Sequence, residues 1–404
     1  MLAGSLGGAS TALAAANPAP AANEMSFEGY AFGTEVNLAS TVESGRSAPS
    51  SLGCTSDTGV THTNSVASVG LPGILSSGTV TTSTTSESVS GGVASTSTSE
   101  TQGLSILGGL VGATTIKSVS TTTRASHAYS VSAAGTQFLN LTVLGLPIAS
   151  NPAPNTKLTL PGVGYVELNQ QNGKVFSGSA HLRVIGIHVV VTLSTPLAPV
   201  GTQIIVSSAQ SSLGGPVHGL LSGVAYGASA NVANTVLAGP EFRETLGCLG
   251  THGAVRTNTG VAVTIPGILT TGTVTDSVEG TDNAKAVSGA ASSTIQGLNL
   301  LAGLVTASAV QSTVTADGRP PTLGNDSTFL GLAVAGFPGI TDNVPANTKL
   351  NLAGLGTLWL NRQTETASTI TVTAIQLVVK VPSNPLGLSP GTVVNVARAS
   401  VGVH

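Results

Sequence analysis

The chain repeats itself at a nearly constant spacing, and this repeat limits the folds open to it more than any other feature. The motif Gly29-Tyr-Ala-Phe-Gly33 returns as Gly223-Val-Ala-Tyr-Gly227, an offset of 194 residues. Because a period near 190 is far longer than the roughly 20–50 residues of solenoid repeats, it indicates a tandem domain duplication. Five further segment pairs match at offsets of 190 to 194: Leu71–Leu75 with Ile265–Leu269, Gln102–Val111 with Gln296–Val305, Phe138–Pro147 with Phe329–Pro338, Asn155–Leu158 with Asn347–Leu350, and Gly201–Thr202 with Gly391–Thr392.

The repeat also sets the predicted boundaries. The first module is expected over 25–210 and the second over 217–404, and the Gly/Pro/Ser segment 211–216 is the predicted linker. Residues 1–24 are small, apolar and Ala-rich, with an Ala-x-Ala cleavage pattern and a Pro/Ala spacer. We interpret them as the remnant of a secretory signal whose true start lies upstream of Met1. The alternative is an Ala-rich tail of a cytosolic protein.

Strand signals fill both copies. Segments such as 370–381 and 188–193 are rich in β-branched residues, and 79–90 alternates weakly in a Ser/Thr field, as is typical of a solvent-facing strand. The best helix candidate, 104–111, carries two adjacent glycines, each costing a helix about 1 kcal/mol relative to Ala. We therefore predict an all-β protein of two tandem homologous modules, each a sandwich or prism. A β-helix is the alternative fold.

The composition excludes several function classes. Charged residues make up 8% of the chain, against about 25% in typical domains, and the net charge is −3. The basic residues are scattered singly, whereas nucleic-acid binding needs a clustered basic surface, so nucleic acid is not an expected partner. No uninterrupted apolar run is long enough for a membrane helix, so no transmembrane anchor is expected.

The two cysteines, Cys54 and Cys248, occupy matching places in the two modules. One cysteine per module cannot form a bridge within a module. Three arrangements stay open: a bond between Cys54 and Cys248, bonds to a second chain, and two free buried thiols. Export favours oxidation.

Patterns of catalytic and metal-binding residues are missing from the sequence. There is no His-Glu-x-x-His, Cys-x-x-Cys, Gly-x-Ser-x-Gly or phosphate-binding loop, and so we predict no catalytic, cofactor or metal residues and no enzyme activity. One acidic cluster, 276–283, has oxygen ligands close enough for Ca²⁺, with a solvated hairpin turn as the alternative. Polar residues that recur in both copies, such as Asn155 with Asn347 and Lys157 with Lys349, are expected to tie turns to backbone groups. An isopeptide bond from either lysine is the competing hypothesis.

Several of these motifs together resemble a known family. The early Gly-Tyr-Ala-Phe-Gly, a cysteine about 25 residues later, the Gln-Gly-Leu motif at 102 and Asn-Thr-Lys-Leu at 155 are similar to the actinobacterial secreted proteins called choice-of-anchor P. The resemblance covers both modules. It implies export and display on a Gram-positive cell envelope through varied C-terminal anchors, and it supplies no catalytic residues. From the C-terminal residues of this sequence we expect no such anchor.

Two functions follow as hypotheses. The first is a non-enzymatic secreted or cell-surface structural or interaction protein, whose partner is another copy of itself or a cell-wall component. The second is a secreted protein that binds, or also hydrolyses, a cell-wall polymer or polysaccharide. Assembly into oligomers or fibres favours the first, and retention on insoluble glycan favours the second.

Overall fold

The structure is a computed structural model that describes residues 25–38, 41–196, 198–232, 235–238, 242–265, 267–384 and 387–404. In this part of the chain nearly all regular structure is β-strand, with one short 3-10 turn, η1 (Leu107–Gly109), at the place of the best helix candidate. The all-β prediction is therefore confirmed. The segment expected to be a secretory signal and spacer, 1–24, lies outside the described residues.

The first module consists of two facing antiparallel sheets, here called sheet A and sheet B. Sheet A contains, in spatial order, β14 (Thr156–Leu160), β15 (Gly164–Val175), β16 (Ser179–Val191), β17 (Gln203–Gly214), β1 (Ser26–Leu38) and β2 (Thr41–Ser44), with β3 (Ser50–Thr55) also paired to β1. Sheet B contains β13 (Leu146–Pro147), β12 (Thr142–Val143), β9 (Val111–Ala125), β8 (Gly92–Ile106), β6 (Leu75–Ser77) and β5 (Val69–Leu71), with β10 (Ala128–Ser132) and β11 (Gln137–Leu139) on β9, and β7 (Val80–Val89) between β8 and β4 (Thr61–Val66).

The second module repeats this arrangement in sheets C and D. Sheet C contains β19 (Thr235–Ala238), β18 (Leu221–Val232), β32 (Val393–Val403), β31 (Thr369–Val379), β30 (Gly356–Glu365) and β29 (Thr348–Leu352), with β20 (Glu244–Leu246) on β18. Sheet D contains β21 (Arg256–Gly260), β24 (Val274–Asn283), β25 (Ala286–Leu300), β23 (Leu269–Thr270) and β22 (Thr264–Ile265), with β26 (Val305–Asp317) between β25 and both β27 (Thr322–Leu330) and β28 (Ala333–Val334).

In each module the first long strand pairs with the last long strand, in the middle of an open sheet. β1 pairs antiparallel with β17, and β18 pairs in the same way with β32. β1, β16 and β17 then pack on β8 and β9, and β18, β31 and β32 pack on β25 and β26, so each module is a sandwich. The long strands are antiparallel, whereas the coils of a β-helix stack in parallel, so the alternative of a β-helix is wrong.

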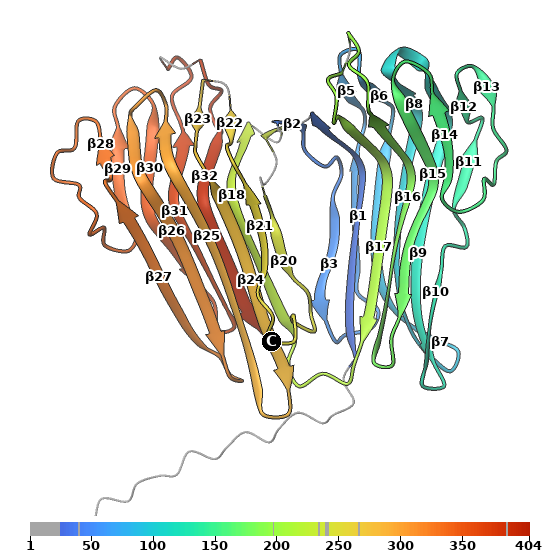
Figure 1. The fold of residues 1–404 in the computed structure, drawn as a ribbon. Coiled ribbons are helices and arrows are strands. Elements are labelled where there is room, and N and C mark those ends of the chain that lie inside the picture. The colour runs from blue at the N-terminus through green and yellow to red at the C-terminus, as the bar shows by residue number, and fades with distance from the viewer. Residues whose placement is uncertain are drawn as a thin grey trace, which may run out of the picture.

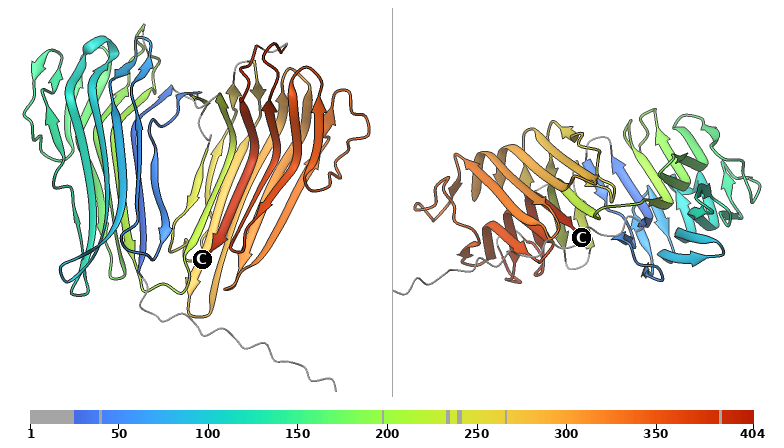
Figure 2. Two further views of the ribbon diagram at one scale, coloured as in Figure 1. Left: turned by 180° about the vertical axis from the view of Figure 1, so that it is seen from behind. Right: turned by 90° about the horizontal axis from the view of Figure 1, so that it is seen from below.

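The two sandwiches stand side by side with their strands running in similar directions (Figure 1). They face opposite ways. Sheet A of the first module and sheet D of the second are in front in Figure 1, and sheets B and C come to the front when the molecule is turned by 180° (Figure 2). This is the relation that a local twofold axis along the strands produces.

The linker differs in part from the prediction. β17 continues to Gly214, four residues into the predicted linker 211–216, and pairs there with both β1 and β16. Ser211 and Leu213 are buried in the sandwich, so the chain leaves the first module at about Gly215. Small residues such as Gly and Ser suit a tightly packed strand as well as a turn, so their abundance in 211–216 does not distinguish a strand from a linker.

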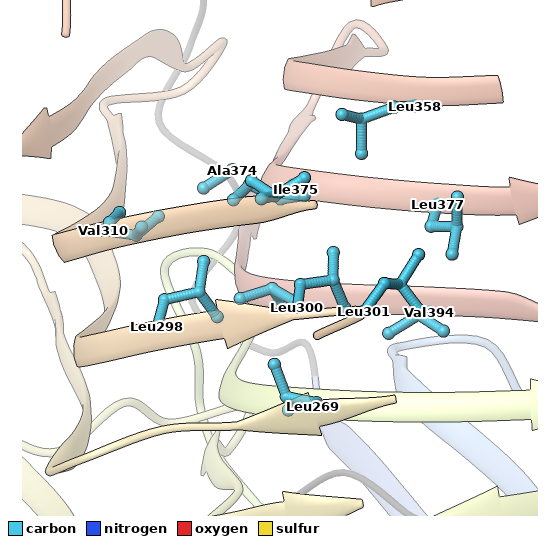
Figure 3. Packing of buried hydrophobic residues seen from close by; sticks show 14 of the residues in the cluster. Leu269, Leu298, Leu300, Leu301, Val310, Leu358, Ala374, Ile375, Leu377 and Val394 are labelled. Carbon is cyan, nitrogen blue, oxygen red and sulfur yellow. The ribbon is translucent and has the colours of Figure 1, made fainter. Parts of the chain in front are cut away.

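One end of each sandwich has an ordinary apolar core. In the first module it includes Ile116, Leu168 and Val206. The second module has a larger cluster, in which Leu300 from sheet D lies close to Val394 of sheet C (Figure 3). These side chains are fully buried, and each such residue contributes roughly 1.5–3 kcal/mol to folding.

The other end of the first module has an interior of hydroxyl groups. Its buried residues come from three neighbouring strands of sheet B: Thr82, Thr84 and Ser86 of β7, Ser95, Ser97, Ser99 and Thr101 of β8, and Ser118, Ser120 and Thr122 of β9. The prediction that 79–90 faces solvent is therefore wrong for alternate residues of β7, whose hydroxyl groups point into the sandwich.

Several of these hydroxyl groups donate to backbone carbonyl groups of the opposite sheet. Ser99 Oγ donates to the carbonyl of Phe32 at 2.8 Å, and Ser118 Oγ donates to that of Ser207 at 2.7 Å. The second module repeats both bonds with Ser293 and Ser312, which donate to Tyr226 and Ala397. A serine side chain is short, so the two sheets must lie close together for such bonds to form.

Glycines in the repeated motif permit this close approach. A Cβ atom on Gly33 would lie 2.1 Å from Cγ1 of Val80, and one on Gly227 would lie 2.3 Å from Cγ1 of Val274. Both distances are shorter than any van der Waals contact. The Gly-x-Ala-x-Gly motif at 29 and 223 is thus explained by packing between sheets, with no need for a ligand.

Candidate functional site

The two modules meet along the edges that contain the cysteines. β3 of the first module contacts β18 of the second, and β2 contacts β19. Cys54 lies near the end of β3, and Cys248 lies in the turn after β20. The edges therefore bring together the equivalent parts of the two copies.

Cys54 and Cys248 form a disulfide bond, with their Cα atoms 5.4 Å apart. This is the first of the three arrangements that the sequence left open. Cys248 is buried against Val217 and Leu220, whereas Cys54 is half-buried. The bond joins residues 194 positions apart and so links the two modules covalently.

Glu28 of β1 lies beside this bond. Its Oε2 is 3.9 Å from Sγ of Cys248, and its carboxylate accepts a hydrogen bond from the backbone N–H of Cys248. Burial raises the pKa of Glu28, while that N–H group and the charge of Arg256 lower it. One carboxylate oxygen and the two sulfur atoms lie within 4.8 Å of one another. While the sulfur atoms are bonded to each other they are not thiolates, so this cluster is no metal site in the oxidised protein.

A groove opens next to the disulfide, between β1 and β3 on one side and β18 and β20 on the other. Its volume is about 520 Å³, and we call it the intermodule groove. The first module contributes Glu28, Tyr30 and Arg46 to its lining, and the second contributes Arg243, Thr245 and Arg256. Among the described residues that line it, Glu28 is the one carboxylic acid, against three arginines.

The arginines of the groove are held in different ways. Arg46 Nε donates to Glu35 at 3.1 Å, and Arg256 pairs with Glu244 at 3.4 Å. Arg243 lies over the ring of Tyr30, with its Cζ 5.9 Å from the ring centroid. Arg46 lies over the same ring at 5.1 Å. Tyr30 thus has a guanidinium group from each module beside it.

The predicted acidic cluster does not form one site. It lies on β24, where successive side chains alternate between the two faces of the sheet, so Asp276 points into the sandwich and Glu279 points out. Asp282 accepts hydrogen bonds from the backbone N–H groups of His218 and Gly219, and so fixes the chain between the modules. The Ca²⁺ hypothesis is therefore wrong for these residues, because they cannot share one ion.

Asp276 is instead a buried carboxyl group in the core of the second module. Its equivalent in the first module is Thr82, whose hydroxyl donates to the carbonyl of Ala48 at 2.6 Å. Among the described residues, neither carboxylate oxygen of Asp276 has a partner at hydrogen-bond distance. Burial raises its pKa to about 7, against the lowering effect of the nearby Ser293 hydroxyl and Gly227 amide.

The recurring polar residues have structural roles. Asn155 and Asn347 lie at positive φ, and their Oδ1 atoms accept from the backbone N–H groups of Gln171 and Gln363, as the interpretation of turn-tying residues predicts. The two lysines of the isopeptide hypothesis are exposed. Lys157 Nζ lies over the Tyr165 ring and Lys349 Nζ over that of Trp359.

The intermodule groove was not found from the sequence. Its three arginines are separated along the chain by as many as 210 positions and belong to different copies of the repeat. They converge because the two copies pack on each other. The matching positions of the cysteines were the one signal that pointed to this place.

The chain matches no known family model and no curated protein in sequence. The resemblance to the choice-of-anchor P proteins therefore stays a prediction. Among the described residues, no helix has the length and apolar character needed to cross a membrane.

Proposed function

We propose that this chain is a non-enzymatic extracellular structural or interaction protein, in which two duplicated sandwiches act as one covalently joined body. The observation that carries the proposal is the disulfide between Cys54 and Cys248. Disulfides persist in oxidising compartments and are rare in the cytosol of most organisms. A bond that locks two domains together suits a protein that must keep its shape outside the cell.

The hydroxyl-rich interior supports the same proposal. The strands are rich in Ser and Thr and poor in charged residues. The chain has 14 Lys and Arg in 404 residues, so proteases that cleave after Lys or Arg find few sites. The interior hydroxyl groups also hold the two sheets of each module by direct hydrogen bonds. A compact body of this kind is suited to display on a surface of the cell envelope.

The alternative, a secreted binding protein for a cell-wall polymer or polysaccharide, is favoured by one observation, the intermodule groove. Hydrolysis of a glycan has less support, because glycosidases use two carboxylic acids that flank the bond. The described lining of the groove offers Glu28, which is already bound to the backbone of Cys248.

Cell fractionation with thiol blocking tests the proposal. Cells of the native host are treated with an alkylating reagent before lysis, and the chain is then detected in the medium, envelope and cytosol on a non-reducing gel. We expect it in the medium or envelope fraction, as an oxidised monomer without alkylated thiols. A chain that is found in the cytosol with both cysteines alkylated would overturn the proposal.

A further inference from the structure

Three arginines, drawn from both modules, converge on the intermodule groove. The whole chain has 14 basic residues, so the gathering of Arg46, Arg243 and Arg256 around one cavity of about 520 Å³ is a concentration of positive charge. Neither module contributes all of them. The charge of the groove exists only where the two copies meet.

Three carboxylates, those of Glu28, Glu35 and Glu244, lie near the three arginines, but among the described residues they leave one arginine without an ion pair. Glu35 pairs with Arg46 and Glu244 pairs with Arg256. Among the described residues, no carboxylate lies within ion-pair distance of Arg243. A further arginine, Arg183, lies on the outer face of sheet A, where its Nε donates to Ser208 Oγ at 3.4 Å. Burial, and after it the charge of Arg46, lowers the pKa of Arg183, which indicates that two cations lie close together here.

The geometry favours an oxyanion. Arg46 and Arg243 approach the same ring of Tyr30 from different modules, so their guanidinium groups are held by packing. A guanidinium group offers a rigid fork of donors that matches a carboxylate or a phosphate. Hydroxyl and amide groups of Ser51, Gln210 and Thr245 also line the groove and can bind the hydroxyl groups of a sugar.

We propose that the intermodule groove binds the carboxylate or phosphate group of an acidic polysaccharide, with Arg243 as the principal anion-binding residue. The proposal rests on the extracellular function proposed above and specifies its ligand. A volume of about 520 Å³ is within the usual range of ligand pockets. The overall charge of −3 argues against a nucleic acid as the source of the phosphate.

The test measures binding of the full chain to two anionic probes and a neutral one. Isothermal titration calorimetry is performed with polygalacturonate, poly(glycerol phosphate) and dextran at low and at physiological salt. We expect binding to at least one anionic polymer, weakened by salt, and none to dextran. Binding to one of the two anionic polymers identifies carboxylate or phosphate as the ligand group, and binding to both shows that either is accepted. No binding to either anionic polymer would overturn the proposal.

Two arginine variants then locate the site. R243Q is expected to lower the affinity at least tenfold, and R243K is expected to fall between R243Q and the wild type. The matched control is R398Q, because Arg398 lies over Tyr226 at the same 5.9 Å as Arg243 over Tyr30, but outside the groove. Equal losses in R243Q and R398Q, with both variants folded by circular dichroism, would contradict the assignment. These outcomes do not depend on the cell compartment, so the proposed function is tested separately.

Discussion

Asp276 shows how one substitution between the two copies changes the electrostatics of an otherwise repeated core. The first module has the hydroxyl of Thr82 at this place, bonded to a carbonyl, and the second has a carboxyl group whose oxygen atoms find no partner at hydrogen-bond distance among the described residues. Burial raises the pKa of Asp276 to about 7, whereas the ordinary pKa of an aspartic acid is 3.8. The folded state therefore binds a proton that the unfolded state releases.

We predict that D276T stabilises the protein, and more so at high pH. The pKa of Asp276 is higher in the folded state than in the unfolded state. Asp276 therefore lowers the free energy of unfolding only slightly below pH 4. The loss grows as the pH rises to about 7 and is constant above that. The shift corresponds to a penalty of about 4 kcal/mol at pH 8. Urea unfolding of both proteins at pH 4 and pH 8 measures the difference.

The first module offers the reverse experiment. T82D places a carboxyl group in the equivalent position and should make stability fall between pH 4 and pH 8. If D276T has the same effect on the free energy of unfolding at both pH values, the carboxyl group of Asp276 is not the buried titrating group described above.

At the scale of the strand, the close approach of the two sheets depends on glycine. We predict that G33A destabilises the protein by about 1–3 kcal/mol, because the added Cβ would overlap Val80 and force the sheets apart. The control is G70A, since a Cβ on Gly70 meets no atom within 4 Å. The midpoints of urea unfolding compare the two variants. Equal midpoints would show that the sheets do not constrain Gly33.

The strands also show where the sequence was informative and where it was not. The offsets of the repeat predicted that both modules share one fold, because spacing is preserved only if the same elements recur. The prediction of which face of β7 meets solvent was wrong, because Thr and Ser side chains can bond equally well to water and to a buried carbonyl group. An alternation of Thr82, Thr84 and Ser86 with other small polar residues gives no sign of which face is inside.

At the scale of the whole molecule, the site arises from packing between copies. The sequence placed the two cysteines at matching positions but could not choose among their three arrangements. It gave no indication that Arg46, Arg243 and Arg256 would meet, because each stands singly in its own segment. Only the relative placement of the two sandwiches brings them to one groove.

The disulfide should contribute to the stability of the whole chain. In the chain-entropy account, a bond that closes a loop of 194 residues stabilises the folded state by about 5 kcal/mol. We predict that C54S/C248S keeps the far-UV circular dichroism of the wild type, because the sheets form within each module, and unfolds at a lower urea concentration. Unchanged unfolding in the double variant would mean that non-covalent contacts alone hold the modules together.

The most direct test of the central claim, that Cys54 and Cys248 join the two copies within one chain, is peptide mapping of the native protein. Trypsin is expected to release residues 47–117, which contain Cys54, and residues 244–256, which contain Cys248. Non-reducing mass spectrometry of the monomer should find these two peptides linked to each other and separated by reduction. Finding either peptide with a free thiol, or linked to a second copy of itself, would contradict the account.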